Sequence, residues 1–176
     1  MYLVFVVHKL REDGYNDITS LWYNINIHPY QEYKQRLDTL KQYAEMINLP
    51  LIVEDNYGVR EFTRNVSSNI DGRCAFCYES RLDFTAKFAK ENGYDAFSTT
   101  LLVSPYQKHE LVINIADSMA KKYGIEFLYQ DFRPGFREGQ AMAREAGLYM
   151  QKYCGCIFSE EDRYKKQIER DKDNID

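Results

Sequence analysis

The chain has 176 residues and a formal net charge of −4, from 23 basic and 27 acidic side chains. This length is typical of a single domain that needs no disulfide bonds to fold. The weak negative charge argues against a strongly basic nucleic-acid binder, although it is compatible with a local basic patch. The apolar run at residues 3–7 is too short for a membrane span or a signal-peptide core, so we expect a cytoplasmic protein. We predict one domain over residues 1–159 and a charged tail over residues 160–176.

Short β-rich runs alternate with helical runs along the chain. In chain order the patterns predict a strand at 18–24, a helix at 29–47, a strand at 51–54, a helix at 74–92, a strand at 96–103, a helix at 109–123, a strand at 125–129 and a helix at 137–149. Pro29 suits a first helical position, and Gly93 and Gly124 are placed to end helices. We expect the charged tail to be a solvated helix that frays.

This alternation predicts an α/β fold with a mostly parallel sheet and helices on both faces. Ligands in such folds bind at the carboxyl ends of the strands. Three segments follow strands here, and they supply the candidate substrate-binding residues Asn24, Asn26, His28, Tyr30, Ser104, Tyr106, Gln107 and Arg133. Structural roles are equally open to them, since His28 can cap or pack, the asparagines can satisfy loop backbone groups and Arg133 can lie on a solvated face.

Four cysteines form two close pairs, Cys74 and Cys77 in C-x-x-C and Cys154 and Cys156 in C-G-C. Thiolates bind metals, and the start of a helix favours the thiolate form. The spacing leaves three readings open: a structural zinc site, an iron–sulfur cluster, or a redox dithiol formed by the C-x-x-C pair.

Four blocks of the sequence share a pattern with a known family. They read "WYNINIHPYQEYKQRLDTLKQYAEMINLPLI", "RCAFCYESRLDFTAKFAKENGYDAFSTTLLVSPYQ", "FLYQDFRPGFREGQ" and "GLYMQKYCGCIFS". In order and spacing, these blocks resemble the QueH type of epoxyqueuosine reductase from about Lys9 to Ser159.

The resemblance implies an activity that composition does not reveal. It implies the last step of queuosine biosynthesis, in which the epoxide oxygen of epoxyqueuosine is removed at the wobble position of tRNA. It further implies a three-layer fold similar to the nucleotide-binding domains of tRNA thiolation enzymes. The implied cofactors are a four-iron, four-sulfur (4Fe-4S) cluster and an additional iron, and the implied partner besides tRNA is an electron donor such as ferredoxin or flavodoxin. By motif, the metal ligands would be Cys74, Cys77, Cys154 and Cys156.

An extruded wobble base can stack on aromatic side chains. Tyr30, Tyr106 and Phe136 are the candidates that the resemblance brings to this role. The sequence identifies no proton donor. A non-catalytic zinc protein on the same four cysteines is the alternative function.

The start of the sequence departs from the family pattern. The family begins with a strand that ends in a Cys-Cys pair, whereas only eight residues precede "KLREDGY" here and no cysteine precedes Cys74. We therefore expect the sheet to lack its central strand and the additional iron to lack ligands, so that activity is impaired. The β-prone residues 2–7 are expected to be the remnant of the first helix, because their distance from "KLRE" leaves no room for a strand, a loop and a helix.

Overall fold

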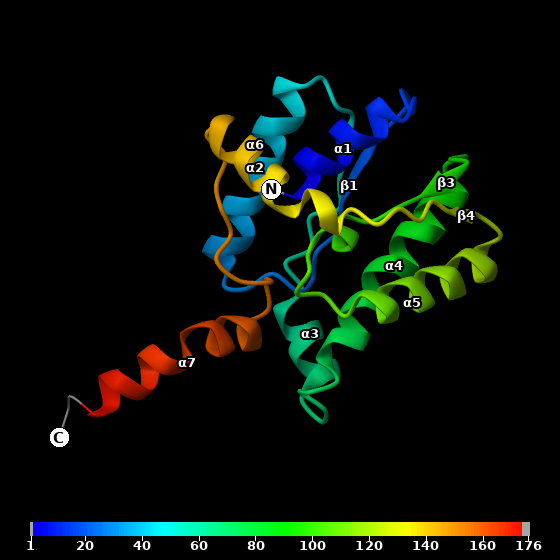
Figure 1. Cartoon of the computed structure of the whole chain (residues 1–176). Coiled ribbons are helices and arrows are strands. Elements are labelled where there is room, and N and C mark those ends of the chain that lie inside the picture. Colours follow the sequence, from blue (N-terminus) through cyan, green and yellow to red (C-terminus); the bar gives the residue numbers. More distant parts are fainter. Residues whose placement is uncertain (1, 174–176) are drawn as a thin grey trace.

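A computed structural model describes residues 2–173, and Met1 and residues 174–176 lie outside the described part. Short strands and longer helices alternate, as Figure 1 shows. The strands are β1 (Ser20–Trp22), β2 (Leu51–Val53), β3 (Ala96–Phe97) and β4 (Glu126–Phe127). The helices are α1 (Tyr2–Glu12), α2 (Tyr30–Met46), α3 (Val59–Val66), α4 (Arg73–Glu91), α5 (His109–Tyr123), α6 (Phe136–Glu145) and α7 (Ile157–Asp173), with 3-10 turns η1 (Thr100–Val103) and η2 (Arg133–Gly135). The predicted α/β class is therefore confirmed in its elements.

The strands form two separate parallel pairs within the described residues, so the predicted sheet is interrupted. β1 pairs with β2, with Leu21 opposite Ile52, and β3 pairs with β4, with Phe97 opposite Phe127. No ladder joins β1 to β3 among the described residues, so each pair has an unpaired edge. The described strands therefore do not form one continuous sheet, in agreement with the expectation that a strand between them is absent.

The longest predicted strand, residues 96–103, is wrong. Only Ala96–Phe97 is a strand, and the chain then turns into η1. The Thr99 side chain accepts a hydrogen bond from the Leu101 amide at 3.2 Å and so caps this turn. The apolar residues that suggested a strand are buried in the core instead, without a neighbouring strand.

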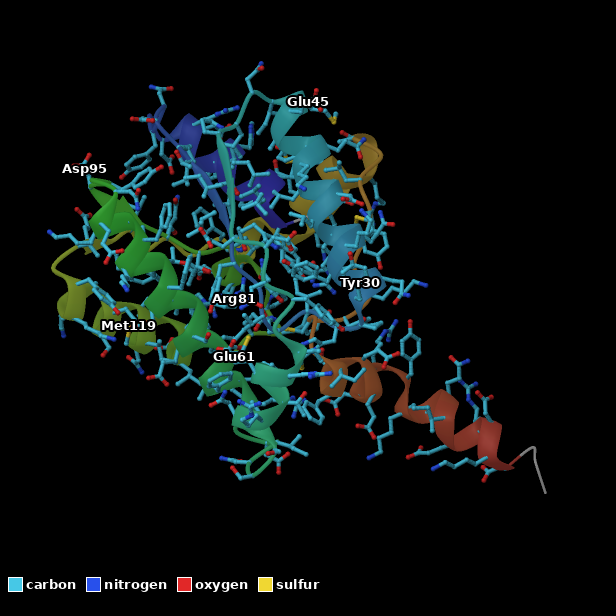
Figure 2. The ribbon with its side chains drawn as sticks, turned by 180° about the vertical axis from the view of Figure 1, so that it is seen from behind. Tyr30, Glu45, Glu61, Arg81, Asp95 and Met119 are labelled. Carbon is cyan, nitrogen blue, oxygen red and sulfur yellow. The ribbon has the colours of Figure 1, made fainter. Side chains whose placement is uncertain are left out.

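Helices lie on both sides of the strand pairs. On one side, α1 contacts α6 and shares small core clusters with α2, in which Val4 meets Tyr43 and Val7 meets Ala44. On the other side, α4 packs along α5. Figure 2 shows the two sets from behind, with Arg81 on α4 and Met119 on α5 at one side and Glu45 on α2 at the other.

The helical prediction for the start of the chain is confirmed, because α1 covers Tyr2–Glu12 despite the β-propensity of its residues. Burial decides this, since Phe5 packs where Gly135 and Gly139 leave no room for a side chain of their own. The close approach of α1 to α6 depends on these two glycines.

Other helix predictions agree within a few residues. Gly93 and Gly124 end α4 and α5 with positive φ, as expected, whereas Pro29 is the N-cap of α2 rather than its first residue. Residues 59–66, for which we predicted no element, form α3. The tail forms α7, which has no buried residue and extends away from the other elements (Figure 1). Residues 174–176 of the predicted tail lie outside the described part.

A cavity of about 730 Å³ separates β1 from β3. Its lining comes from both strands, from α1 and α2 on one side and from α4 on the other, and it extends to Cys154. We call it the β1–β3 cavity. Between Tyr2 and Asp173, none of the helices is both long and apolar enough to cross a membrane.

Candidate functional site

The two cysteine pairs lie close enough for the charge of one pair to act on the other, although 76 residues separate Cys77 from Cys154. Cys74 and Cys77 lie in the first two turns of α4, and the other pair lies in the CGC loop (residues 153–156), directly before α7. Burial lowers the pKa of the Arg73 guanidinium, but the neighbouring side chains, chiefly Cys156, raise it more, so the start of α4 and the loop lie close together. All four cysteines are free thiols.

Burial and mutual charge act on the thiols of α4. Burial raises the pKa of the Cys74 thiol, and the neighbouring charge of Cys154 raises it further. Burial raises the pKa of the Cys77 thiol to about 12. The charge of Arg81 lowers this pKa, and the charges of the other three cysteines raise it slightly. A thiol in such surroundings becomes a thiolate readily only when a cation binds beside it.

The chemistry of the donors bears on the kind of group that fits. Thiolates are the usual ligands of zinc and of iron–sulfur clusters, so the four cysteines fit either group by donor chemistry. Within Tyr2–Asp173, no three Cys, His, Asp or Glu side chains are arranged to hold one ion.

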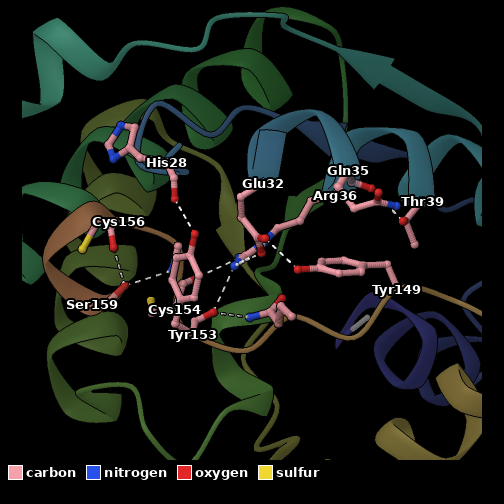
Figure 3. A network of polar contacts seen from close by, with 12 residues as sticks. His28, Glu32, Gln35, Arg36, Thr39, Tyr149, Tyr153, Cys154, Cys156 and Ser159 are labelled. Carbon is pink, nitrogen blue, oxygen red and sulfur yellow. Dashed lines mark hydrogen bonds and ion pairs between the residues drawn. The ribbon is translucent and has the colours of Figure 1, made fainter. Parts of the chain in front are cut away.

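A polar network fixes the CGC loop against α2, as Figure 3 shows. Arg36 donates to the carbonyl oxygens of Cys154 at 2.8 Å and Tyr153 at 3.0 Å. Glu32 pairs with Arg36 at 2.7 Å and accepts a hydrogen bond from the Tyr149 hydroxyl at 2.6 Å. Both charged side chains are about 90% buried, with exposures of 10% and 11%, so the pair holds the loop backbone in a place where solvent screens it little.

Further hydrogen bonds close the loop from its other sides. The His28 amide donates to the Gly155 carbonyl at 2.8 Å, and the Tyr153 hydroxyl donates to the His28 carbonyl at 2.6 Å. Ser159 at the start of α7 accepts from the Gly155 amide at 3.2 Å and donates to the Cys156 carbonyl at 2.7 Å. The loop backbone therefore has partners from α2, from the segment after β1 and from α7.

The segment after β3 contacts one sulfur directly. Gln107 donates from Nε2 to the Cys154 sulfur at 3.5 Å. Its Oε1 accepts from the hydroxyl of buried Tyr78 at 2.7 Å, and this fixes the orientation of the amide. Tyr78 lies one residue after Cys77, so α4 positions both its own cysteines and the residue that orients Gln107.

Most of the predicted substrate-binding residues lie near this site. The structure places Asn24, Asn26, Ser104 and Gln107 on the lining of the β1–β3 cavity, which also includes Cys154. His28 is 1% exposed, with Nε2 at 3.1 Å from the Ile25 carbonyl and its ring against Phe62 and Tyr57. This is the packing role that sequence left open for His28.

The aromatic candidates differ in exposure. Tyr106 is 83% exposed, and its ring meets Phe136 edge-on with 5.9 Å between the ring centres; the ring centre of Tyr2 is 5.8 Å from that of Phe136. Tyr30 is 54% exposed and contacts Tyr57. Arg133 forms a two-pronged ion pair with Asp131, with distances of 2.8 and 2.7 Å, in the segment after β4.

Sequence reasoning missed the residues that hold the loop. Glu32 and Arg36 have the i, i+4 spacing of an ion pair on a helix, and this signal was readable. Tyr149, Tyr153 and Arg73 gave no such signal, because their partners are far away in the chain.

Comparison with known proteins shows which class of protein this chain belongs to. The profile of the family described as "Epoxyqueuosine reductase QueH" matches residues 2–162. The curated protein named epoxyqueuosine reductase QueH from Dehalococcoides mccartyi is 38% identical over 156 residues, which is 89% of this chain and 85% of that protein. The one of the same name from Thermotoga maritima is 34% identical over 166 residues, with coverage of 87% and 84%.

The class is therefore oxidoreductase. The chain belongs to the epoxyqueuosine reductase QueH family, as the sequence blocks predicted.

Proposed function

We propose that this protein reduces epoxyqueuosine to queuosine at the wobble position of tRNA, with a 4Fe-4S cluster on Cys74, Cys77, Cys154 and Cys156. The observation that carries the proposal is the meeting of two distant cysteine pairs at the carboxyl ends of the strands, in a chain of the QueH family. We further propose, from the same kinship, that the fold is a variant of the three-layer nucleotide-binding domains of tRNA thiolation enzymes.

The reaction sets the requirements for the site. Two electrons and two protons convert the epoxide to an alkene, both C–O bonds break, and the oxygen leaves as water. The bound cluster would supply electrons one at a time from an external donor, for which ferredoxin or flavodoxin is suitable. An additional iron, if present, would have to take ligands other than these four cysteines, and we assign it none.

The chain's own residues prepare the sulfurs and receive the base. The Arg36–Glu32 pair holds the CGC loop, and Gln107 donates to the Cys154 sulfur, an interaction that stabilises negative charge on it. Tyr106 exposes its ring beside Phe136, where an extruded base can stack. Asn24, Asn26 and Ser104 supply polar groups in the adjoining cavity, and Tyr30 and Arg133 are further contacts for the tRNA.

Anaerobic reconstitution with iron and sulfide tests the cofactor. We expect an iron–sulfur absorption band that is lost in Cys74→Ser and Cys154→Ser and kept in Ser67→Ala, a control on the exposed end of α3. One equivalent of zinc without iron, in protein purified without oxygen, would instead establish the zinc protein.

The activity is tested separately on tRNA that carries epoxyqueuosine, with a chemical reductant and nucleoside mass spectrometry. We expect a product lighter by one oxygen. A protein that holds the cluster and gives no product would refute the catalytic proposal while leaving the cofactor proposal intact.

A further inference from the structure

The amide of Gln107 lies between a buried tyrosine and one of the four sulfurs. Its Nε2 donates to the Cys154 sulfur at 3.5 Å, and its Oε1 accepts from the Tyr78 hydroxyl at 2.7 Å. The three residues come from different parts of the chain, because Tyr78 belongs to α4, Gln107 lies between η1 and α5, and Cys154 lies in the CGC loop. The fold therefore joins the buried hydroxyl to the sulfur through a single amide group.

The hydrogen bond that Tyr78 receives fixes the direction of these bonds. The Lys108 backbone amide donates to the Tyr78 hydroxyl oxygen at 3.3 Å. A backbone N–H can only donate, and a tyrosine hydroxyl has one proton, so that proton is left for Gln107. The oxygen of the Gln107 amide therefore faces Tyr78, and its amino group faces Cys154.

Burial keeps Tyr78 in this orientation. Its side chain is 2% exposed and belongs to the same core cluster as Leu82 and Leu102. Side chains in a close-packed core have little room to move. The packing of the ring, and not solvent, therefore decides where the hydroxyl points.

The two ends of an amide have opposite effects on a neighbouring thiolate. The amino group donates and stabilises negative charge on the sulfur, whereas the oxygen would lie against that charge and repel it. Because the Tyr78 hydroxyl occupies the oxygen of Gln107, the favourable end remains for the sulfur.

Cys154 differs from the other three cysteines in exposure. It is exposed, whereas Cys77 and Cys156 are buried and Cys74 is partly buried. At an exposed sulfur, water competes as a donor and has no fixed orientation. A donor that the protein core holds in one orientation needs no such reorganisation when the charge on the sulfur changes.

Hydrogen bonds to cysteine sulfurs affect how readily a bound metal group accepts an electron. Reduction adds one negative charge, and a donor beside a sulfur stabilises the more negative state. Such a hydrogen bond therefore raises the reduction potential of the group.

We propose that Tyr78 is a positioning residue, which acts through Gln107 to raise the reduction potential of the metal group held at Cys154. The inference rests on the proposed function, since it requires a redox-active group on the four cysteines. It adds that the core of α4 gives one sulfur a hydrogen bond of fixed direction, and that this bond adjusts the electron affinity of the site.

Reduction potentials of the reconstituted full chain test the proposal. Anaerobic titration with dithionite and redox mediators, followed by absorbance, measures the fraction reduced. In Gln107→Leu the sulfur loses its donor, and we expect the equilibrium constant for one-electron reduction to fall about tenfold, which is about 59 mV. Gln107→Glu places an acceptor of the same shape at the sulfur and should lower the constant further. The titration contains no tRNA, so a role of Gln107 in substrate binding does not affect it.

Tyr78→Phe keeps the packed ring and removes only the hydroxyl. The Gln107 amide is then free to turn, and we expect the same constant to fall roughly threefold. Because Tyr78 acts through Gln107, its effect should vanish when Gln107→Leu is already present. This double variant separates positioning from a merely structural role of the hydroxyl.

Two control variants match these changes away from the sulfurs. Tyr123→Phe removes a hydroxyl that donates to Asp83 at 2.8 Å, at the last residue of α5. Gln167→Glu makes the same charge change as Gln107→Glu on the exposed helix α7. Both should leave the potential unchanged, and a shift as large as in the test variants would overturn the proposal.

The remaining outcomes separate this proposal from the proposed function. An unchanged potential in Gln107→Leu would overturn it, as would an effect of Tyr78→Phe that persists in the Gln107→Leu background. Both results require a bound cluster and so leave the cofactor proposal intact. A chain that takes up no cluster would refute the cofactor proposal and this inference with it.

Discussion

The CGC loop and the β1–β3 cavity lie side by side and differ in how their polar groups are matched. The backbone of the loop has hydrogen-bond partners from α2, from the segment after β1 and from α7. The cavity has two free strand edges and the unpartnered Asn26 Oδ1 and Ser98 hydroxyl. The candidate metal ligands Cys154 and Cys156 are thus held in place although the sheet beside them is interrupted.

The difference shows what each region depends on. The loop is held by side chains that reach it from neighbouring elements, so it does not need a continuous sheet. Sheet cohesion would require backbone partners along β1 and β3, and these are missing within the described residues. Four predictions, from the largest expected effect to the smallest, test this contrast.

Removal of Arg36 should have the largest effect. In Arg36→Met, buried Glu32 loses its partner and two loop carbonyls lose their donor. We expect the free energy of unfolding to fall by about 3 kcal/mol, as when one member of a buried ion pair is removed. Urea unfolding measures this.

The matched control is Lys34→Met, which breaks an exposed pair with Asp38 on the same helix. Such pairs contribute about 0.5 kcal/mol or less. Equal effects of the two substitutions would show that Arg36 does not hold the loop.

Tyr153 tests the loop through a single hydrogen bond. Tyr153→Phe removes the bond from its hydroxyl to the His28 carbonyl at 2.6 Å. We expect a loss of about 1 kcal/mol, because an acceptor is left without its partner. Tyr15→Phe, at a position 46% exposed, should change nothing. If Tyr153→Phe leaves the free energy of unfolding unchanged, this hydrogen bond does not help to hold the loop.

A substitution in the lining of the β1–β3 cavity should stabilise the protein, whereas the substitutions in the loop network destabilise it. Ser98→Ala removes a buried hydroxyl that has no partner, so we expect the free energy of unfolding to rise by up to about 1 kcal/mol. Thr99→Val is the matched control, because Thr99 caps η1 and its loss should cost about 1 kcal/mol. If Ser98→Ala destabilises the protein instead, the hydroxyl has a partner and the contrast between the regions weakens.

His28, whose backbone bonds to the CGC loop, predicts the smallest effect, which is a dependence of stability on pH. Burial lowers the pKa of its ring, opposed in part by the hydrogen bond with the Ile25 carbonyl. The unfolded chain then binds the proton more readily than the folded protein, so stability is complete above the unfolded pKa of about 6.5 and falls as the pH drops below it.

Urea unfolding at several pH values from about 6.5 downward measures this fall in stability. The slope should be at most about 1.4 kcal/mol per pH unit. It should vanish in His28→Gln and persist in His8→Gln, because His8 is exposed on α1. A slope that persists in His28→Gln would assign the effect to another group.

Which features can be predicted from the sequence depends on whether they arise from local or from long-range interactions. Helices α2, α4 and α5 were predicted to within two residues, because periodic apolar positions and glycine stops are local signals. The Cys-x-x-Cys and Cys-Gly-Cys pairs also identified the candidate metal site, and the motif blocks identified the family.

Residues 96–103 show where such reasoning fails. A run rich in Thr, Leu and Val favours a strand by propensity, but a strand needs a partner along its edge. The Thr99 cap and burial of the Leu101–Val103 side chains stabilise a turn instead. The reach of Arg36 to Cys154, across 118 positions, is of the same long-range kind.

The sequence by itself determined the α/β alternation, the family and the four candidate metal ligands, because these follow from local periodicity and from motifs. Only the tertiary structure decided that the strands form two separate pairs, that a cavity lies between their free edges, and that Arg36, Tyr153 and Ser159 hold the CGC loop. These features depend on contacts between residues far apart in the chain. The local sequence pattern does not indicate which distant residue a side chain or a strand edge will contact.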